Sequence, residues 1–90
     1  MKRDYESPVY KKLRTRTLRR DGHCCQMPGC SNTTRLHVHH IRPWSIAAHL
    51  RFEPDNLITL CKLCHDSIRN QEHIYEPLFM GIVRSNANNS

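Results

Sequence analysis

Two pairs of cysteines have the spacing expected of ligands for one metal ion: Cys25, Cys30, Cys61 and Cys64. A tight backbone bend lets both thiolates of a pair reach one ion. A second pair roughly thirty residues away completes a tetrahedral four-sulfur site of the kind that binds zinc. The first pair encloses Pro28-Gly29, which suits a turn. Cys24 competes with Cys25 as a ligand, and the tighter loop around Pro28-Gly29 favours Cys25.

The composition favours a metal site over disulfides. Five cysteines would leave one thiol unpaired in a disulfide framework. The N-terminus has no apolar segment typical of a secretory signal, so we expect a cytoplasmic chain with reduced thiols. A redox role for the Cys61–Cys64 pair is disfavoured because the sequence lacks a βαβ pattern. Four thiolates leave no open coordination position, so this zinc is expected to be structural and to supply folding free energy.

Basic residues are concentrated near the N-terminus. The net charge is +6 at pH 7, and eight of the fourteen Lys and Arg residues lie among the first twenty residues. This density suits nucleic acid as a partner, although a cationic helix that is merely solvated would have the same composition. The candidate phosphate contacts are Lys11, Lys12, Arg14, Arg16, Arg19, Arg20, Arg42 and Arg69. No apolar run approaches membrane-spanning length, so no membrane partner is expected.

The chain length allows one domain over residues 1–90 with a single small core. Ser7-Pro8 resembles an N-cap followed by a proline in the first turn, which predicts a helix over residues 8–20 that ends at Asp21-Gly22. One face of this helix carries residues four apart: Val9, Leu13 and Thr17. The helix and its stop form a basic N-terminal segment, residues 1–22.

The remaining pattern predicts a loop, two strands and a helix. The expected elements are a loop or metal knuckle over 23–35, strands over 36–41 and 56–60, a connection over 44–55 with a short helical turn at 45–50, and a helix from 62 to about 73. Glu76-Pro77 is expected to end this helix. The C-terminal extension, residues 74–90, should then pack its apolar part on the core and end in a frayed tail. This is a small α+β fold whose core spans residues 23–73.

The histidines belong to motifs that recur in order along the chain. The stretch LHVHHIRPW at residues 36–44 is followed by DNLITLCKLCH at residues 55–65 and preceded by RRDGHCCQMPGC at residues 19–30. Over residues 19–69 these motifs resemble the HNH endonuclease family, in which a His-Ile/Val pair and a proline precede an Asn-Leu and then a Leu-Cys-x-x-Cys-His. The resemblance implies a ββα-metal finger, a β-hairpin plus a helix, with the four-cysteine zinc site of small phage-type members.

The resemblance also implies a role for each residue of the pattern. His40 is the general base that activates water, and Asn56 pins the loop and orients that histidine. His39 and His65 are the ligands of a single catalytic divalent metal, and cleavage of DNA leaves 5′-phosphate and 3′-hydroxyl ends. A neutral imidazole is well suited to accept a proton near neutral pH. A divalent ion with open positions can bridge the scissile phosphate and the departing oxygen.

The chain departs from the family pattern at several positions. His39 stands where aspartate is common, and a pair of imidazoles is a softer ligand set that favours Mn²⁺, Ni²⁺, Co²⁺ or Zn²⁺ relative to Mg²⁺. Ala47-Ala48 replaces a glycine pair in the connecting loop. Arg69 replaces a lysine and keeps its charge, and it shares a helix face with His65.

Strand geometry raises a question about the adjacent histidines. Neighbouring residues in a strand point to opposite faces, so His39 and His40 reach one phosphate only if the strand ends, twists or bulges near Pro43. His37 shares a face with His39. We expect His37 to be a partly exposed strand histidine, with a role as a third ligand or as a partner of the metal ligands as the alternative.

Together these observations predict a metal-dependent endonuclease that acts on double-stranded DNA with little sequence preference, because no recognition helix with base-reading side chains is evident. One alternative is a zinc-stabilised module that binds nucleic acid without cutting it. Another is an accessory domain of a larger DNA-processing complex, since members of this size resemble phage proteins linked to DNA packaging. The combination of His40, Asn56 and His65 favours the nuclease, because a binding module does not require these residues at these spacings.

Overall fold

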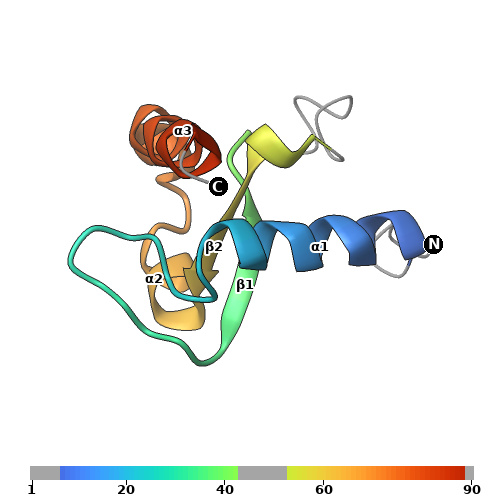
Figure 1. Cartoon of the computed structure of the whole chain (residues 1–90). Coiled ribbons are helices and arrows are strands. Elements are labelled where there is room, and N and C mark those ends of the chain that lie inside the picture. Colours follow the sequence, from blue (N-terminus) through green and yellow to red (C-terminus); the bar gives the residue numbers. More distant parts are fainter. Residues whose placement is uncertain (1–6, 43–52, 89–90) are drawn as a thin grey trace.

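The computed structural model describes residues 7–42 and 53–88, so the helical turn predicted at 45–50 lies outside the described residues. The elements follow in the order α1 (Pro8–Arg20), β1 (Leu36–His40), the 3₁₀ turn η3 (Pro54–Asn56), β2 (Leu57–Cys61), α2 (Lys62–Ser67) and α3 (Glu72–Asn88) (Figure 1). This is a small α+β fold in which an antiparallel hairpin lies among helices, as the sequence predicts.

Helix α1 has the boundaries predicted from its sequence. The Ser7 hydroxyl caps its N-terminus by accepting a hydrogen bond from the Tyr10 backbone N–H at 3.1 Å. The buried face differs from the prediction in one position. It consists of Tyr10, Leu13 and Thr17, whereas Val9 is exposed. An aromatic residue three positions before Leu13 has the helical spacing of a packed face, so Tyr10 rather than Val9 meets the sheet.

The hairpin is built around β2, whose five residues are all buried. β1 and β2 pair in antiparallel register, with His40 opposite Leu57 and Leu36 opposite Cys61. No third strand covers the outer edge of β2 in the described part of the chain, and other groups take its place. The Asp21 carboxylate accepts a hydrogen bond from the Thr59 N–H at 2.9 Å, and the Gln26 N–H donates to the Thr59 carbonyl at 3.0 Å.

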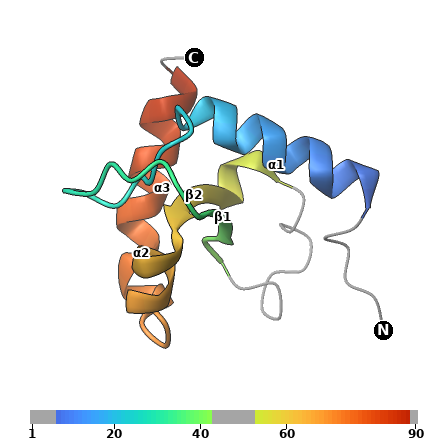
Figure 2. The same cartoon turned by 90° about the horizontal axis from the view of Figure 1, so that it is seen from below.

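The helices cover the two faces of the hairpin separately. Figure 2 shows α1 on one side of the strands, with α2 and α3 on the other. The core side chains come from the sheet and from the C-terminal helices: Ile41, Ile58, Leu60, Ile68, Phe79 and Val83. This arrangement gives each face of β1 a different set of neighbours.

The C-terminal region contains two helices where the sequence predicts one. α2 ends at Ser67 rather than near residue 73, and a turn with Asn70 at φ 68° separates it from α3. Pro77 does not end a helix but lies inside α3, at an exposed position where its missing N–H costs one hydrogen bond. Burial of Phe79 and Val83 stabilises the helix beyond it.

The predicted frayed tail is likewise helical through Asn88. One reason is that Asn86 donates hydrogen bonds to the Asp21 carboxylate and to the Gln26 side chain, both at 2.9 Å. No helix among the described residues is both long and apolar enough to span a membrane.

A buried ion pair joins the end of α1 to the sheet. Asp21 is only 4% exposed, and the Arg20 guanidinium contacts both of its carboxylate oxygens, at 2.8 and 3.0 Å. Arg20 also donates to the backbone carbonyls of Pro54 and Leu57. One carboxylate and one guanidinium therefore tie together α1, η3, β2 and α3.

We predict that Asp21→Asn lowers the free energy of unfolding by about 3 kcal/mol, because it leaves the buried Arg20 without a counter-charge. Urea unfolding in buffer that contains zinc measures this loss. Asp66→Asn is the matched control, because its ion pairs with Lys62 and Arg69 are exposed to solvent and should contribute little to stability. An equal loss in the two variants would contradict the prediction.

Candidate functional site

Four thiols converge at the junction of the hairpin with α2. The Sγ atoms of Cys25, Cys30, Cys61 and Cys64 all lie within 4.8 Å of one another. The Cys30 and Cys61 sulfurs are 3.9 Å apart, close to the separation of about 3.8 Å in a tetrahedral site with metal–sulfur bonds of about 2.3 Å. The four cysteines are therefore positioned to hold a metal ion, with zinc the ion that four thiolates favour.

The local backbone conformation directs both thiols of each pair into the four-cysteine cluster. In the first pair the Cys30 N–H donates to the Met27 carbonyl at 2.9 Å, which closes a turn in which Gly29 has a φ of 84°. In the second pair Cys61 ends β2, and Cys64 lies in the first turn of α2. Cys24 does not belong to this cluster. Its sulfur instead lies 3.5 Å from the Asp21 carbonyl.

The electrostatics of the cluster suit a cation. A hydrogen bond from the Cys64 backbone N–H lowers the pKa of Cys61 to about 7, which favours its thiolate. Burial raises the pKa of Cys25 and of Cys64. A divalent cation offsets this cost, because it binds the thiolate form of all four side chains.

Three histidines, which we call the histidine cluster, meet on the other side of β1 from α1: His37, His39 and His65. His39 is buried, and its ring centroid lies 5.3 Å from that of His65 and 5.9 Å from that of Phe79, both in edge-on contacts. His37 is exposed and stacks on His65 at 5.8 Å. The structure thus brings together His39 and His65, which are twenty-six positions apart in the sequence.

One atom of this cluster has the properties of a metal ligand. The buried Nε2 of His39 has no hydrogen-bond partner in the described structure. Burial, reinforced by the neighbouring His65, lowers the pKa of His39 to about 4, and burial together with His37 also lowers the pKa of His65. Both imidazoles are therefore neutral near pH 7 and keep a lone pair for a cation. The two side chains therefore have the donor chemistry of a divalent-metal site.

His40 faces the opposite side of the hairpin. Its ring stacks on Tyr10 of α1 with centroids 6.2 Å apart, and β1 stays regularly paired through His40 opposite Leu57. Of the three possibilities that the sequence leaves open, the structure shows that the strand ends: β1 stops at His40, and no bulge interrupts its pairing within the described residues, which do not include Pro43. His39 and His40 point to different faces, as the alternation of a strand requires.

Asn56 holds the segment that follows His40. Its Oδ1 accepts a hydrogen bond from the Arg42 N–H at 2.9 Å, and its Nδ2 donates to the Arg42 carbonyl at 3.3 Å. The Ile41 N–H also donates to the Asn56 carbonyl at 2.8 Å. The amide is itself buried, so these contacts fix the backbone where β1 ends.

A groove of about 380 Å³ runs beside the outer edge of β1. Its lining residues are Tyr10, Arg14, His37, Val38 and His65. Tyr10 and Arg14 come from α1 on one face of the hairpin, and His65 comes from α2 on the other. A group that lies along this edge can therefore be reached by side chains from both faces.

The basic residues predicted to contact phosphate fall into two groups. Five of them lie exposed on α1: Lys11, Lys12, Arg14, Arg16 and Arg19. The others form ion pairs. Arg20 pairs with the buried Asp21 at 2.8 Å, Arg42 with Glu76 at 2.9 Å, and Arg69 with Asp66 at 3.2 Å. Sequence reasoning missed the structural role of Arg20. Its counter-charge Asp21 is the next residue, but the two carbonyls that it binds, those of Pro54 and Leu57, are far along the chain.

Sequence reasoning also missed Tyr10, which lines the groove on the α1 side and packs against His40. The helical spacing of Tyr10 with Leu13 and Thr17 is the signal that could have identified it.

Comparison with known proteins gives one result. A family model described as HNH endonuclease matches residues 23–71, more than half of the chain. The matched segment contains the four clustered cysteines, the histidine cluster, His40 and Asn56. Neither curated proteins nor solved structures show a significant match to the chain.

We predict that Cys25→Ser lowers the zinc content of the purified protein and lowers its melting temperature, since metal binding contributes to folding of a site of this kind. Elemental analysis of the purified protein and thermal unfolding measure the two effects. Cys24→Ser is the matched control and should retain both metal and stability. If Cys24→Ser loses the metal instead, the sulfur cluster is wrongly assigned.

Proposed function

Because the chain belongs to the HNH endonuclease family, we propose that it hydrolyses DNA phosphodiester bonds, with His40 as the general base and a divalent cation held by His39 and His65. The observation that carries the proposal is the edge-on contact of His39 with His65, in which the buried Nε2 of His39 has no hydrogen-bond partner. A buried polar atom without a partner is costly, and a metal ion bound there would remove this cost.

The outer edge of β1 is the place where the substrate phosphate would lie. His40 lies on the α1 face of the hairpin and the His39–His65 pair on the opposite face, and of these three residues His65 lines the groove at the edge. A phosphate beside the edge needs no bulge in the strand to meet both groups. The groove lined by Tyr10 and Arg14 on one side and His65 on the other supports this position.

Each residue then contributes a distinct step. His40 accepts a proton from the attacking water. The resulting hydroxide attacks the phosphorus, the bond from phosphorus to the 3′ oxygen breaks, and the products carry a 5′-phosphate and a 3′-hydroxyl. Asn56 fixes the backbone beside His40 and so limits the positions that the imidazole can take. Tyr10 packs against the His40 ring and restricts it further.

The cation bound by His39 and His65 would stabilise the charge that develops on the phosphoryl group and on the leaving oxygen. Two neutral imidazoles are softer donors than a carboxylate, so Mn²⁺, Ni²⁺, Co²⁺ or Zn²⁺ should bind better than Mg²⁺. The four-cysteine cluster would hold a separate structural zinc with no open position for substrate.

Double-stranded DNA is the proposed substrate, bound mainly through its phosphates. The exposed Lys and Arg residues of α1 contact phosphates without reading bases, which accounts for the low sequence preference that we propose. A phage DNA-packaging assembly or another DNA-processing complex is the proposed setting, and cleavage that requires an added partner would support it.

We predict that His40→Ala lowers the rate of plasmid nicking in the presence of Mn²⁺ by at least about a hundredfold, the contribution typical of a general base. DNA affinity and melting temperature should change little. His73→Ala is the control, since His73 is an exposed histidine of α3 to which no role in the site is assigned.

Nicking by His40→Ala at the wild-type rate would show that another group is the base. A wild-type chain that binds DNA but cuts with no divalent ion would favour the non-catalytic binding module.

We further predict that His39→Asp shifts the metal preference toward Mg²⁺, because a carboxylate is a harder donor than an imidazole. The measurement is the ratio of nicking rates with Mg²⁺ and with Ni²⁺, compared between the variant and the wild type. The ratio within one protein is insensitive to the amount of folded enzyme. An unchanged ratio would mean that residue 39 does not bind the catalytic ion.

A further inference from the structure

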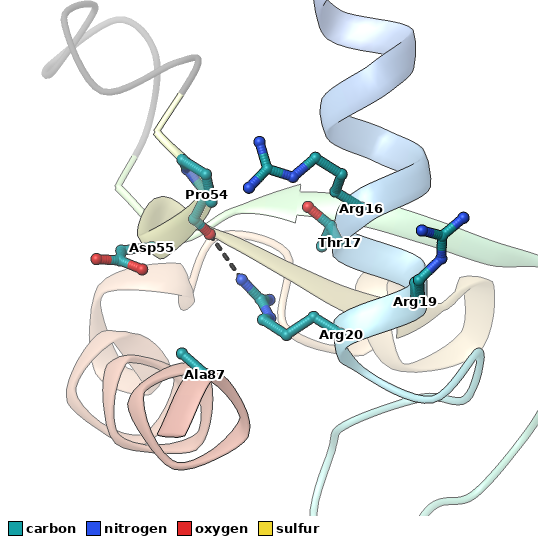
Figure 3. A pocket seen from close by; sticks show the side chains of 7 residues that line it. All are labelled: Arg16, Thr17, Arg19, Arg20, Pro54, Asp55 and Ala87. Atoms are coloured by element: carbon teal, nitrogen blue, oxygen red, sulfur yellow. Dashed lines mark hydrogen bonds between the residues drawn. The ribbon is translucent and has the colours of Figure 1, made fainter. Parts of the chain in front are cut away.

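A cleft of about 470 Å³ lies between the C-terminal half of α1, the η3 turn and the end of α3. Its lining residues are Arg16, Thr17, Arg19, Arg20, Pro54, Asp55 and Ala87. Figure 3 shows the side chains of Arg16 and Arg20 extending toward Pro54, whereas that of Arg19 extends away from it. The cleft lies on the α1 side of the hairpin and is separate from the histidine cluster.

The three arginines of this cleft differ in their availability to a ligand. The charge of Arg20 is balanced by Asp21, and its remaining donors bind backbone carbonyls. Across residues 7–42 and 53–88, the guanidinium groups of Arg16 and Arg19 have no ion-pair or hydrogen-bond partner, and the Arg19 backbone carbonyl only accepts bonds at the end of α1. Two guanidinium groups are therefore free to bind an anion, and a single carboxylate, that of Asp55, lies on the opposite wall.

The exposed basic side chains of α1 that include Arg16 and Arg19 are arranged along the helix axis. Lys12, Arg16 and Arg19 have the i, i+4, i+7 spacing that places side chains on one stripe of a helix. This stripe is about 10 Å long at 1.5 Å per residue. One strand of DNA carries a phosphate about every 3.4 Å along the helix axis. A linear polyanion therefore matches the stripe better than a single small anion does.

The cleft also lies beside the end of the hairpin that carries His40. Arg20, on the cleft wall, donates to the carbonyl of Leu57, and Leu57 is the pairing partner of His40. The His40 ring faces α1, on the same side of the sheet as the cleft. The cleft and His40 therefore lie on the same side of the hairpin.

We propose that the cleft between α1 and η3 is a binding site for the DNA phosphate backbone, in which Arg16 and Arg19 contact phosphates and Asp55 on the facing wall limits the affinity. The identity of the partner rests on the proposed function. The unpartnered guanidinium groups are the evidence for the binding site. The proposal predicts that the arginines on one wall of the cleft strengthen DNA binding and that Asp55 on the other wall weakens it.

The test measures binding of a short labelled DNA duplex by fluorescence anisotropy over a range of salt concentrations, without added divalent ions. The double variant Arg16→Gln/Arg19→Gln should bind about tenfold more weakly at low salt. The slope of log affinity against log salt should fall in magnitude by about 1.8, since each phosphate contact contributes about 0.9. Asp55→Asn should bind about two- to threefold more tightly, because a like charge near the phosphate is removed.

The matched control is Arg35→Gln/Arg84→Gln, which removes two charges from exposed arginines that do not line the cleft. Its salt slope should equal that of the wild type. Melting temperature and metal content confirm that each variant is folded. If the Arg16/Arg19 variant and the control bind DNA equally, the cleft is not a DNA site.

If Asp55→Asn binds DNA with the same affinity as the wild type, Asp55 does not belong to the binding site. Cleavage is scored in a separate assay with Mn²⁺, so a wild-type chain that binds but does not cut contradicts only the proposed function.

Discussion

The buried carboxylate of Asp21 holds the parts of this small domain together. β2 belongs to a sheet of only two strands in the described structure, so the backbone groups on its outer edge need partners other than water. Asp21 accepts a hydrogen bond from Thr59 on that edge and another from Asn86 of α3, while Arg20 balances its charge. A buried charge is tolerated only when it is paired in this way, and the pairing fixes where α1 ends relative to the sheet.

The position of α1 decides what each face of the hairpin presents. On the α1 face, Tyr10 packs against His40, and Arg16 borders the cleft next to η3. On the other face, His39 is enclosed by α2 and α3 and meets His65. The edge of β1 lies between these two environments. Under the proposed function, a base on one face and a metal-binding pair on the other would serve one phosphate without a break in the strand.

The sulfur cluster and the histidine cluster meet in α2. Cys64 and His65 are consecutive residues of this six-residue helix, and Cys61 precedes it directly. A helix this short is not stable alone, so its position depends on what binds it. A metal held by the thiols would also fix the direction of the His65 side chain. A structural ion and a catalytic ion would then be coupled through one turn of helix, although they share no ligand.

The sequence by itself determined the features that depend on short-range patterns. The N-cap at Ser7 and the stop at Asp21 bounded α1, alternation and turn residues located both strands, and cysteine spacing predicted the sulfur cluster. The tertiary structure decided what depends on distant partners. Pro77 is accommodated inside α3 because burial of the following residues outweighs one lost hydrogen bond. Arg20 serves the fold rather than a ligand because Asp21, η3 and β2 surround it. The faces of His39 and His40 follow from strand alternation, but only packing against α1 and α3 gives each imidazole its environment. Local patterns reflect backbone chemistry, whereas charge pairing and burial depend on residues that only the folded chain brings together.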